Sequence, residues 1–307
     1  MRKKELSLEE QVKKYKRRSW ILSAVLFFFI SITGYYIYLN YDYLAFKHFI
    51  AQHYIYTNTL DELYKKEINL DVKGKYYSNF DDLVISVVTK RIRELNKDRY
   101  TYLFIPEQLE KYKAEEKEEA SRSEVKSLTD QIVYLHLTNF SEYTRKFVFD
   151  HLDLLKKHPN IIIDFRDNPG GDIFAMNKLA SLFIPKGSTI TTDKLRIMDW
   201  TYKSRKAPIL SYNKIFILQN KNSASASECF IGALKDNLKN VTLVGEPTYG
   251  KGIGQYTMPL KRGYAVKATT MLWYTPSGYN VQGKGIPPDI TYTAEDIIDF
   301  SIKAIQK

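Results

Sequence analysis

Three short segments of small and polar residues carry the groups that an acyl-transfer reaction needs. They are N-P-G-G at 168–171, N-S-A-S-A-S-E at 222–228 and G-K-G at 250–252. Together they supply hydroxyl groups, one amine and backbone N–H groups that small neighbours leave open. A hydroxyl nucleophile, a base and fixed donors for a developing oxyanion are the parts of nucleophilic catalysis at a carbonyl carbon.

The hydroxyl candidates lie where a strand is expected to pass into a helix. Residues 214–219 (K-I-F-I-L-Q) form an apolar, β-branched run that predicts a buried strand, and residues 226–238 have apolar side chains at helical spacing. Ser225 falls at this junction, where free N–H groups of the first helical turn can face negative charge. Each single serine could instead be a plain helix N-cap, but three serines alternating with alanines exceed what a cap needs.

Lys251 is the candidate base. Residues 241–244 predict another strand, and the lysine follows the next turn, between two glycines. A lysine acts as a base only when its amine is uncharged, which requires burial or a nearby positive charge to lower its pKa. If the chain continues as a strand, Gln255 shares a face with Lys251 and could orient the amine. The alternative interpretation is a solvated loop lysine.

The glycine segment is the candidate oxyanion site. Residues 161–166 (I-I-I-D-F-R) predict a buried strand, and apolar residues from Ile173 onward repeat at helical spacing. Between them, Gly170 and Gly171 can turn their N–H groups into a cavity, as an oxyanion hole requires. The alternative is an ordinary tight turn.

These segments resemble the carboxyl-terminal processing protease family, the tail-specific serine proteases that use a Ser/Lys dyad. The motifs occur in family order: I-I-I-D-F-R-D-N-P-G-G at 161–171, N-S-A-S-A-S-E at 222–228, V-G-E-P-T-Y-G-K-G-I-G-Q at 244–255, Y-T-P-S-G at 274–278 and G-I-P-P-D-I at 285–290. The resemblance implies Ser225 as nucleophile, Lys251 as general base and Gln255 as the residue that positions the lysine. It also implies an oxyanion hole from the N–H groups of Ala226 and of Gly170 or Gly171. The choice of Ser225 over its neighbouring serines rests on the resemblance, because spacing alone does not make it.

The chain departs from the family pattern in two places. The interval from Ser225 to Lys251 is about one residue longer than usual, which a surface loop at 238–240 can absorb. Relatives also carry a PDZ domain that recognises substrate carboxyl termini. Here D-R-Y-T-Y-L-F-I-P-E at 98–107 resembles the segment ahead of that domain, and V-Y-L-H-L at 133–137 resembles the first core strand beyond it. The interval is too short for a PDZ domain, so recognition of free carboxyl tails is not carried over.

The amino-terminal part predicts a membrane helix. Residues 20–39 carry no formal charge and are long enough to cross a bilayer. Eight basic and three acidic residues precede them, so the positive-inside rule places the amino terminus in the cytoplasm and the residues from about 41 onward outside. A cleaved signal peptide is the weaker alternative, because the run ends in Y-Y-I-Y-L-N rather than at a small-residue cleavage site.

The remaining pattern divides the chain further. We expect a basic cytoplasmic tail at 1–19, the transmembrane helix at 20–39, a helical amino-terminal region at 41–110, a charged connector at 111–130 and a serine protease core at 131–307. The expected fold class is α/β, with a mixed sheet flanked by helices in the core. An apolar stripe within the helical region is predicted from Leu83, Val84, Val87, Val88, Ile92 and Leu95.

Other kinds of function find less support. The net charge of +11 suits contact with anionic lipid or cell-wall polymer, and no nucleic-acid-binding motif accompanies it. The five histidines show no H-E-x-x-H spacing, so no metal or organic cofactor is expected, and a Ser-His-Asp triad through His136 or His158 is a minor alternative. Cys229 is the only cysteine, so no intramolecular disulfide forms. The sequence therefore predicts a membrane-anchored serine endopeptidase with a polypeptide substrate, and the alternative is a catalytically silent peptide-binding or scaffold protein. It gives no indication of oligomeric state.

Overall fold

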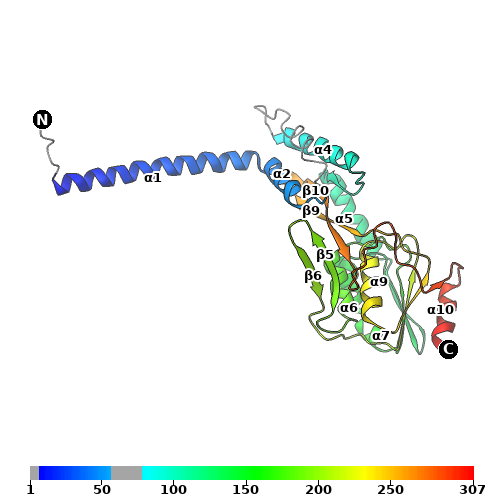
Figure 1. Cartoon of the computed structure of the whole chain (residues 1–307). Coiled ribbons are helices and arrows are strands. Elements are labelled where there is room, and N and C mark those ends of the chain that lie inside the picture. Colours follow the sequence, from blue (N-terminus) through cyan, green and yellow to red (C-terminus); the bar gives the residue numbers. More distant parts are fainter. Residues whose placement is uncertain (1–6, 57–77) are drawn as a thin grey trace.

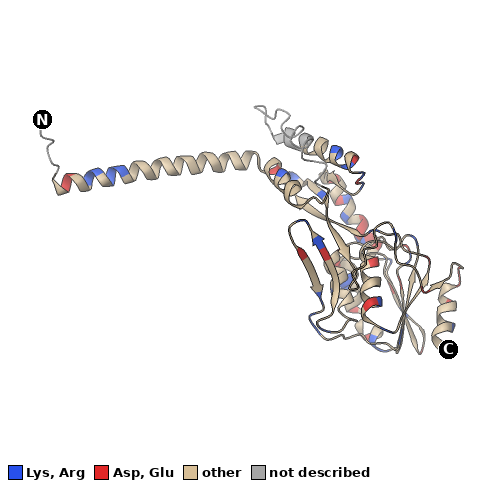
Figure 2. Cartoon of the chain, in the orientation of Figure 1, with Lys and Arg blue, Asp and Glu red and all other residues tan. Residues whose placement is uncertain are grey.

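Helix α1 (Leu8–Leu39) extends away from the rest of the molecule in the computed structural model, which describes residues 7–56 and 78–307 (Figure 1). Ser7 caps the helix, donating its N–H to the Glu10 carboxylate at 2.9 Å and accepting the Glu10 N–H at 3.3 Å. The basic residues lie in the first part of the helix and the remainder is uncharged (Figure 2). Its apolar window has a mean hydropathy of 1.9 and none of it is buried. By length and composition α1 can be a membrane span or a signal sequence.

A six-stranded mixed sheet forms the centre of the fold, in the order β11-β8-β7-β4-β3-β2. Only the pairing of β2 with β3 is antiparallel. Its strands are β2 (Glu124–Thr129), β3 (Ile132–His136), β4 (Asn160–Asp164), β7 (Lys214–Gln219), β8 (Val241–Gly245) and β11 (Ile290–Thr291). Because helices cover both faces, β4 and β7 are continuous apolar runs, as is typical of buried parallel strands.

The helices divide between the two faces of this sheet. The larger core lies against α6 (Glu142–Asp150), α7 (Leu152–Lys156), α8 (Ile173–Ala180) and α9 (Ala226–Asn237), and α10 (Ile297–Gln306) covers the opposite face. The carboxyl ends of β4 and β7 lead into α8 and α9, respectively. This order brings the glycine segment and the serine segment to one edge of the sheet, where ligands of open α/β sheets are commonly bound.

A second, antiparallel sheet packs beside α9. Its order is β1-β10-β5-β6, and β9 also pairs with β10. Its strands are β1 (Tyr102–Phe104), β5 (Thr189–Leu195), β6 (Asp199–Lys203), β9 (Ile253–Pro259) and β10 (Ala265–Tyr274). A separate apolar cluster joins it to α2 (Tyr41–His53) and α4 (Ser78–Leu95), and α5 (Pro106–Ala120) runs from β1 to β2.

The observed fold is the predicted α/β class with a mixed sheet and flanking helices. The strands expected at 161–166, 214–219 and 241–244 form as β4, β7 and β8, and residues at the end of the expected connector form β2. The predicted stripe on α4 was wrong for Val87 and Leu95, which are 54% and 43% exposed. The prediction is confirmed for Val88 and Ile92, which face the core together with Ile85, a residue outside the predicted stripe. Full burial of such a side chain contributes about 1.5–3 kcal/mol. Leu83 and Val84 lie outside the described side chains.

Candidate active site

Ser225 occupies a strained position immediately before α9. Its backbone has φ 57° and ψ −114°, a conformation that costs a non-glycine residue about 1–3 kcal/mol and persists only where the surroundings enforce it. Ser223 and Ser227 are fully buried, and their hydroxyls donate to the carbonyls of Phe165 at 2.8 Å and Asn168 at 3.0 Å. Ser225 alone of the three is partly exposed. The structure thus provides a reason for choosing Ser225 that does not depend on the resemblance.

Glu228 joins the serine segment to the lysine segment. Its Oε2 accepts the backbone N–H of Ser225 at 2.8 Å and that of Lys251 at 2.9 Å. Its Oε1 accepts the Gly250 N–H at 2.7 Å and the Thr248 hydroxyl at 2.6 Å. Two segments separated by more than twenty residues are therefore held on one side chain.

The Glu228 carboxyl is fully buried. Burial raises its pKa, and the hydrogen bonds from Thr248, Lys251, Gly250 and Ser225 oppose that rise by stabilising the carboxylate. A buried carboxylate with four donors is a satisfied group that fixes backbone geometry. Glu228 ends the N-S-A-S-A-S-E motif at 222–228, but the sequence alone did not predict a role for it. The available signal was its position three residues after Ser225, which is that of a capping acid.

The glycine segment lies directly against Ser225. A Cβ added to Gly170 would approach the Ala226 nitrogen to 2.8 Å and the Ser225 Cβ to 2.9 Å. The Gly170 N–H is already engaged, because it donates to Asn168 Oδ1 at 2.9 Å. Within the described ranges, the N–H groups of Gly171 and Ala226 have no hydrogen-bond acceptor. Of the two predicted glycines, Gly170 is thus the one that contacts Ser225, and Gly171, next along the chain, is the one with a free donor.

The amine of Lys251 rests on an aromatic ring. Its Nζ lies 4.5 Å from the centre of the Tyr100 ring, while its carbonyl accepts the Trp273 indole N–H at 2.8 Å. Burial lowers the pKa of Lys251 to about 8, and the positive charges of Lys267 and Arg99 act in the same direction. Glu228 and Asp98 oppose them. No hydrogen bond joins Lys251 Nζ to the Ser225 hydroxyl in the part of the chain that the structure describes.

Asp98 holds the Tyr100 loop in place. Its buried carboxylate accepts the Thr101 hydroxyl at 2.6 Å, the Tyr100 N–H at 3.0 Å, and the hydroxyls of Tyr54 and Thr269 at 3.1 Å each. The Arg99 guanidinium donates to the Tyr100 hydroxyl at 3.0 Å. Tyr100 is a site residue that sequence reasoning missed, since its contact with the lysine spans about 150 positions.

Gln255 lies on β9, where it is paired with Thr269. Its amide nitrogen is buried without a hydrogen-bond partner, and no hydrogen bond connects it to Lys251 among the described residues. The predicted orienting contact is therefore absent from this arrangement of the side chains.

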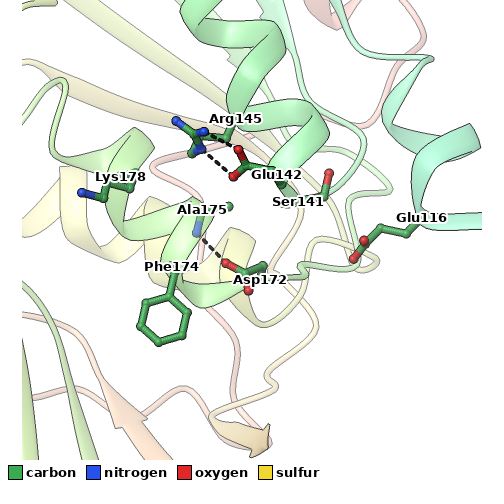
Figure 3. A pocket seen from close by; sticks show the side chains of 8 residues that line it. All are labelled: Glu116, Ser141, Glu142, Arg145, Asp172, Phe174, Ala175 and Lys178. Carbon is green, nitrogen blue, oxygen red and sulfur yellow. Dashed lines mark hydrogen bonds and ion pairs between the residues drawn. The ribbon is translucent and has the colours of Figure 1, made fainter. Parts of the chain in front are cut away.

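A cavity of about 560 Å³ opens beside the glycine segment (Figure 3). Its lining includes Glu116, Asp172 and Phe174, and in the picture Arg145 faces Glu142, to which it is bonded. Burial, with the nearby charge of Asp172, raises the pKa of Glu116. Asp172 directly follows Gly171 and accepts the Ala175 N–H as the cap of α8.

The minor alternatives gain no geometric support. His158 precedes β4, at the sheet edge opposite to the glycine segment, and its ring nitrogen lies 3.3 Å from the Leu154 carbonyl oxygen. Neither His158 nor His136 forms a hydrogen bond with Ser225 in the described structure. Over the same residues no group of three His, Cys, Asp or Glu side chains is placed to hold a metal ion.

Comparison with known proteins places the serine, lysine and glycine segments in one family. The model of peptidase family S41 matches residues 131–292, more than half of the chain. A probable CtpA-like serine protease of Staphylococcus aureus strain N315 is 42% identical over 148 residues, which are 46% of this chain and 28% of that protein. A probable CtpA-like serine protease of Staphylococcus haemolyticus is 41% identical over 157 residues, 48% of this chain and 31% of its own length. The matched segment thus spans under a third of these relatives.

Solved structures share the fold at low sequence identity. The photosystem II D1 C-terminal processing protease superposes with a TM-score of 0.63 and 16% identity, covering 83% of this chain and 92% of that one. A lipoprotein from Streptococcus agalactiae superposes with a TM-score of 0.67 and 16% identity, covering 87% and 96%. At these identities the likeness extends to the fold alone.

Proposed function

Since this chain belongs to peptidase family S41, we propose that it is a serine endopeptidase that hydrolyses polypeptides through Ser225 and Lys251. The observation that carries the proposal is the shared oxygen of Glu228, which holds the backbones of both residues within hydrogen-bonding distance of one atom. The lysine side chain is long enough to turn from the Tyr100 ring toward the serine hydroxyl. The lowered pKa of Lys251, about 8, leaves part of its amine uncharged near neutral pH.

The reaction that we infer has two halves. The Ser225 oxygen attacks a peptide carbonyl while the neutral Lys251 amine takes the hydroxyl proton, and the N–H groups of Gly171 and Ala226 bind the oxyanion. The resulting ammonium then returns the proton to the leaving amine, and water hydrolyses the acyl-enzyme. The Gln255 amide nitrogen has no hydrogen-bond partner, so this side chain is free to turn, and in the proposed active arrangement its carbonyl oxygen would accept an N–H of the rotated amine.

The test is cleavage of a mixed peptide library by the full chain in detergent micelles, followed by mass spectrometry. Ser225→Ala and Lys251→Ala should each lose cleavage by at least about a hundredfold, in the range that removal of a nucleophile or base produces. Ser181→Ala, at a partly exposed position, and Lys239→Ala, at an exposed one, both away from the site, are the matched controls. Equal cleavage by all five proteins would reject the assignment of both residues.

A catalytically silent peptide-binding or scaffold protein is the second candidate. It is favoured by one observation, the position of the Lys251 amine on Tyr100 instead of on the serine hydroxyl. A binding protein would retain peptide without cleaving it, and Ser225→Ala would leave that retention unchanged. The same library, analysed for bound and for cut peptide, distinguishes the two.

We also propose that α1 is a retained membrane anchor with its amino terminus in the cytoplasm and the peptidase domain outside. Its exposed apolar surface and the basic residues at its amino-terminal end support this orientation. Cys229 is buried, so introduced cysteines can be labelled with little background. In intact cells an impermeant maleimide should label Lys239→Cys and spare Ser7→Cys. The reverse pattern would invert the topology, and recovery of the domain free of the membrane would indicate a cleaved signal sequence.

A further inference from the structure

We propose that Asp193, together with the aromatic side chains of Phe174, Trp200 and Tyr202, forms a recognition site for a lysine or arginine side chain of the polypeptide substrate. The proposal rests on the proposed peptidase function and adds a substrate class to it. None of these four residues belongs to the catalytic machinery described above. The sequence motifs also gave no indication of a role for these four residues.

Asp193 is a buried carboxyl that the fold leaves without a partner. Its side chain is 2% exposed, and its Oδ1 has no hydrogen-bond donor. No Lys or Arg pairs with it in the described ranges, and the adjacent Lys194 has its amine over the Tyr274 ring. Desolvation raises the pKa of Asp193 to about 7. A buried, unpaired carboxyl lowers the stability of the fold and holds no other group in place. Such groups are characteristic of functional sites.

The pairing of strands directs this carboxyl toward the active-site helix. On β5, Asp193 is opposite Trp273 of β10 on one side and Trp200 of β6 on the other, so the three side chains share one face of the sheet. Trp273 belongs to the core that packs against α9, and its indole bonds to the Lys251 carbonyl. The Asp193 charge also helps to raise the pKa of Cys229 on α9.

The distance to Ser225 follows from the way α9 lies along β5. Asn237, near the end of the helix, donates to the Thr189 carbonyl, and Cys229, near its start, lies by Asp193. Eight helical residues and four strand residues both cover about 12–13 Å, so the two elements run side by side. Ser225 precedes Cys229 by about one helical turn, or roughly 6 Å. Along the helix axis, Asp193 is therefore displaced from the nucleophile by about 6 Å, nearly the length of two extended residues, and the spacing between helix and strand adds to this distance.

A row of three aromatic rings, two exposed and one partly buried, lies between the glycine segment and Asp193. The Phe174 and Tyr202 rings are 6.2 Å apart, and those of Tyr202 and Trp200 are 6.3 Å apart. Phe174 is 64% and Trp200 48% exposed, so the row presents a contiguous apolar surface to solvent, as interaction sites do. Tyr202 lies near both Asp172 and Asp193, since both charges raise the pKa of its hydroxyl. The row thus begins beside Gly171 and ends at the buried carboxyl.

Among the side chains of a substrate, a cationic one fits a carboxylate lined by aromatic faces best. A lysine or arginine would donate to the unpartnered Oδ1, and its charge would be attracted by the faces of the rings. Trp200 covers the outer side of Asp193 from the edge strand, and an exposed side chain of this kind can change rotamer readily to admit it. The cavity of Figure 3 fits a cation less well, because Glu142 is already paired with Arg145 and Asp172 with the start of α8.

The test measures both cleavage and binding by the full chain in detergent micelles. Peptide pairs differ at one position, lysine against norleucine, scanned through the residues that flank the cleaved bond. The wild type should favour lysine at one position by about tenfold or more in kcat/KM, and Asp193→Asn should abolish that preference while it still cleaves the norleucine peptide. Asp199→Asn, at an exposed position of the same hairpin, is the matched control and should keep the preference.

Binding to the Ser225→Ala chain, measured by fluorescence anisotropy, provides a second readout that does not require catalysis. The lysine peptide should bind about tenfold more tightly than the norleucine peptide, and the added Asp193→Asn substitution should equalise them. Equal treatment of lysine and norleucine at every position, or an undiminished preference in a folded Asp193→Asn chain, would overturn the proposal. Cleavage that survives Ser225→Ala would instead refute the proposed mechanism and leave the binding comparison valid.

Discussion

The amine of Lys251 lies 4.5 Å from the centre of the Tyr100 ring, so an aromatic side chain holds the proposed base. A ring face favours the charged ammonium by about 0.5–2 kcal/mol, whereas burial favours the neutral amine. Removal of the ring face with retention of the bulk should therefore lower the pKa of Lys251. We predict that Tyr100→Leu shifts the rise of kcat/KM with pH to lower pH by up to about one unit.

Tyr100→Phe is the matched control for this prediction, because it keeps the ring and removes only the hydroxyl that Arg99 contacts. Its profile should stay close to that of the wild type. An upward shift in Tyr100→Leu would show that the ring acts by excluding water and not through its π electrons. An equal shift in both variants would assign the effect to the hydroxyl and its contact with Arg99.

The neutral fraction of Lys251 predicts the pH dependence of the wild-type enzyme. With a pKa of about 8, the base gains activity as the pH rises through 8 and reaches its full value above it. Lys267 is the nearby cation with the largest effect on this pKa. Lys267→Gln removes that charge, so the pKa of Lys251 should rise and the profile should move to higher pH. A profile that is flat between pH 6 and 9 would contradict a lysine base.

Glu228 should be needed for catalysis although it does not touch substrate. In Glu228→Gln, an amide nitrogen replaces one acceptor oxygen and faces backbone N–H groups, either those of Ser225 and Lys251 or that of Gly250. We expect kcat/KM to fall by about 10- to 100-fold, because the positions of the two residues relax, and stability to fall by about 1–3 kcal/mol. Glu246→Gln, on the partly exposed turn after β8, provides the control. Unchanged activity in Glu228→Gln would mean that the carboxylate serves stability alone.

Asp193 predicts a pH dependence of stability with a definite sign. Its pKa is about 7 in the folded chain and near 4 when unfolded, so between these values the folded state binds more protons. The contribution of Asp193 to the free energy of unfolding is fully present below pH 4 and is lost as the pH rises through 7. The loss amounts to a few kcal/mol at most. Asp193→Asn should therefore raise the melting temperature most at pH 8 and least at pH 4. Melting curves at both pH values check this, and an equal change at both would contradict the assigned pKa.

Much of the fold could be predicted because the central strands are buried on both faces. Continuous apolar runs such as I-I-I-D at 161–164 and K-I-F-I-L-Q at 214–219 leave little ambiguity, and the small residues after them mark the sheet edge where the site forms. The β5–β6 hairpin has no such signal. Its strands mix threonine, aspartate and lysine with aromatic residues, and its tip at 196–198 lacks glycine or proline.

The candidate site was predictable in its motifs and not in its contacts. Ser225, Lys251 and the two glycines stand in recognisable short segments, whereas Tyr100 and Asp193 reach the site only through the pairing of β1 and β5 with β10. The role of Glu228 depends on donors at 248–251, more than one element away. Such contacts depend on tertiary structure, which local periodicity does not encode. The Lys251–Gln255 hydrogen bond was predicted from a shared strand face. Such a face brings two side chains to the same side of the strand but does not determine whether they bond to each other.

The glycine segment provides a final prediction. Gly170 has a positive φ and also approaches Ser225 closely, and these two reasons for a glycine can be tested separately. Gly170 has φ +99°, and an added Cβ would lie 2.6 Å from the Ala224 carbonyl oxygen and 2.9 Å from Ser225. Gly187 has a similar φ of +88° with open space around it. Gly187→Ala should therefore cost only the backbone strain, about 1–2 kcal/mol, and keep full activity per folded molecule. Gly170→Ala must in addition push the serine segment aside, so its kcat/KM should fall at least tenfold in the molecules that remain folded. Measurement of kcat/KM at a temperature where circular dichroism shows both variants folded separates the two effects. Equal activities would mean that Gly170 is required for its backbone conformation and not for its close approach to Ser225.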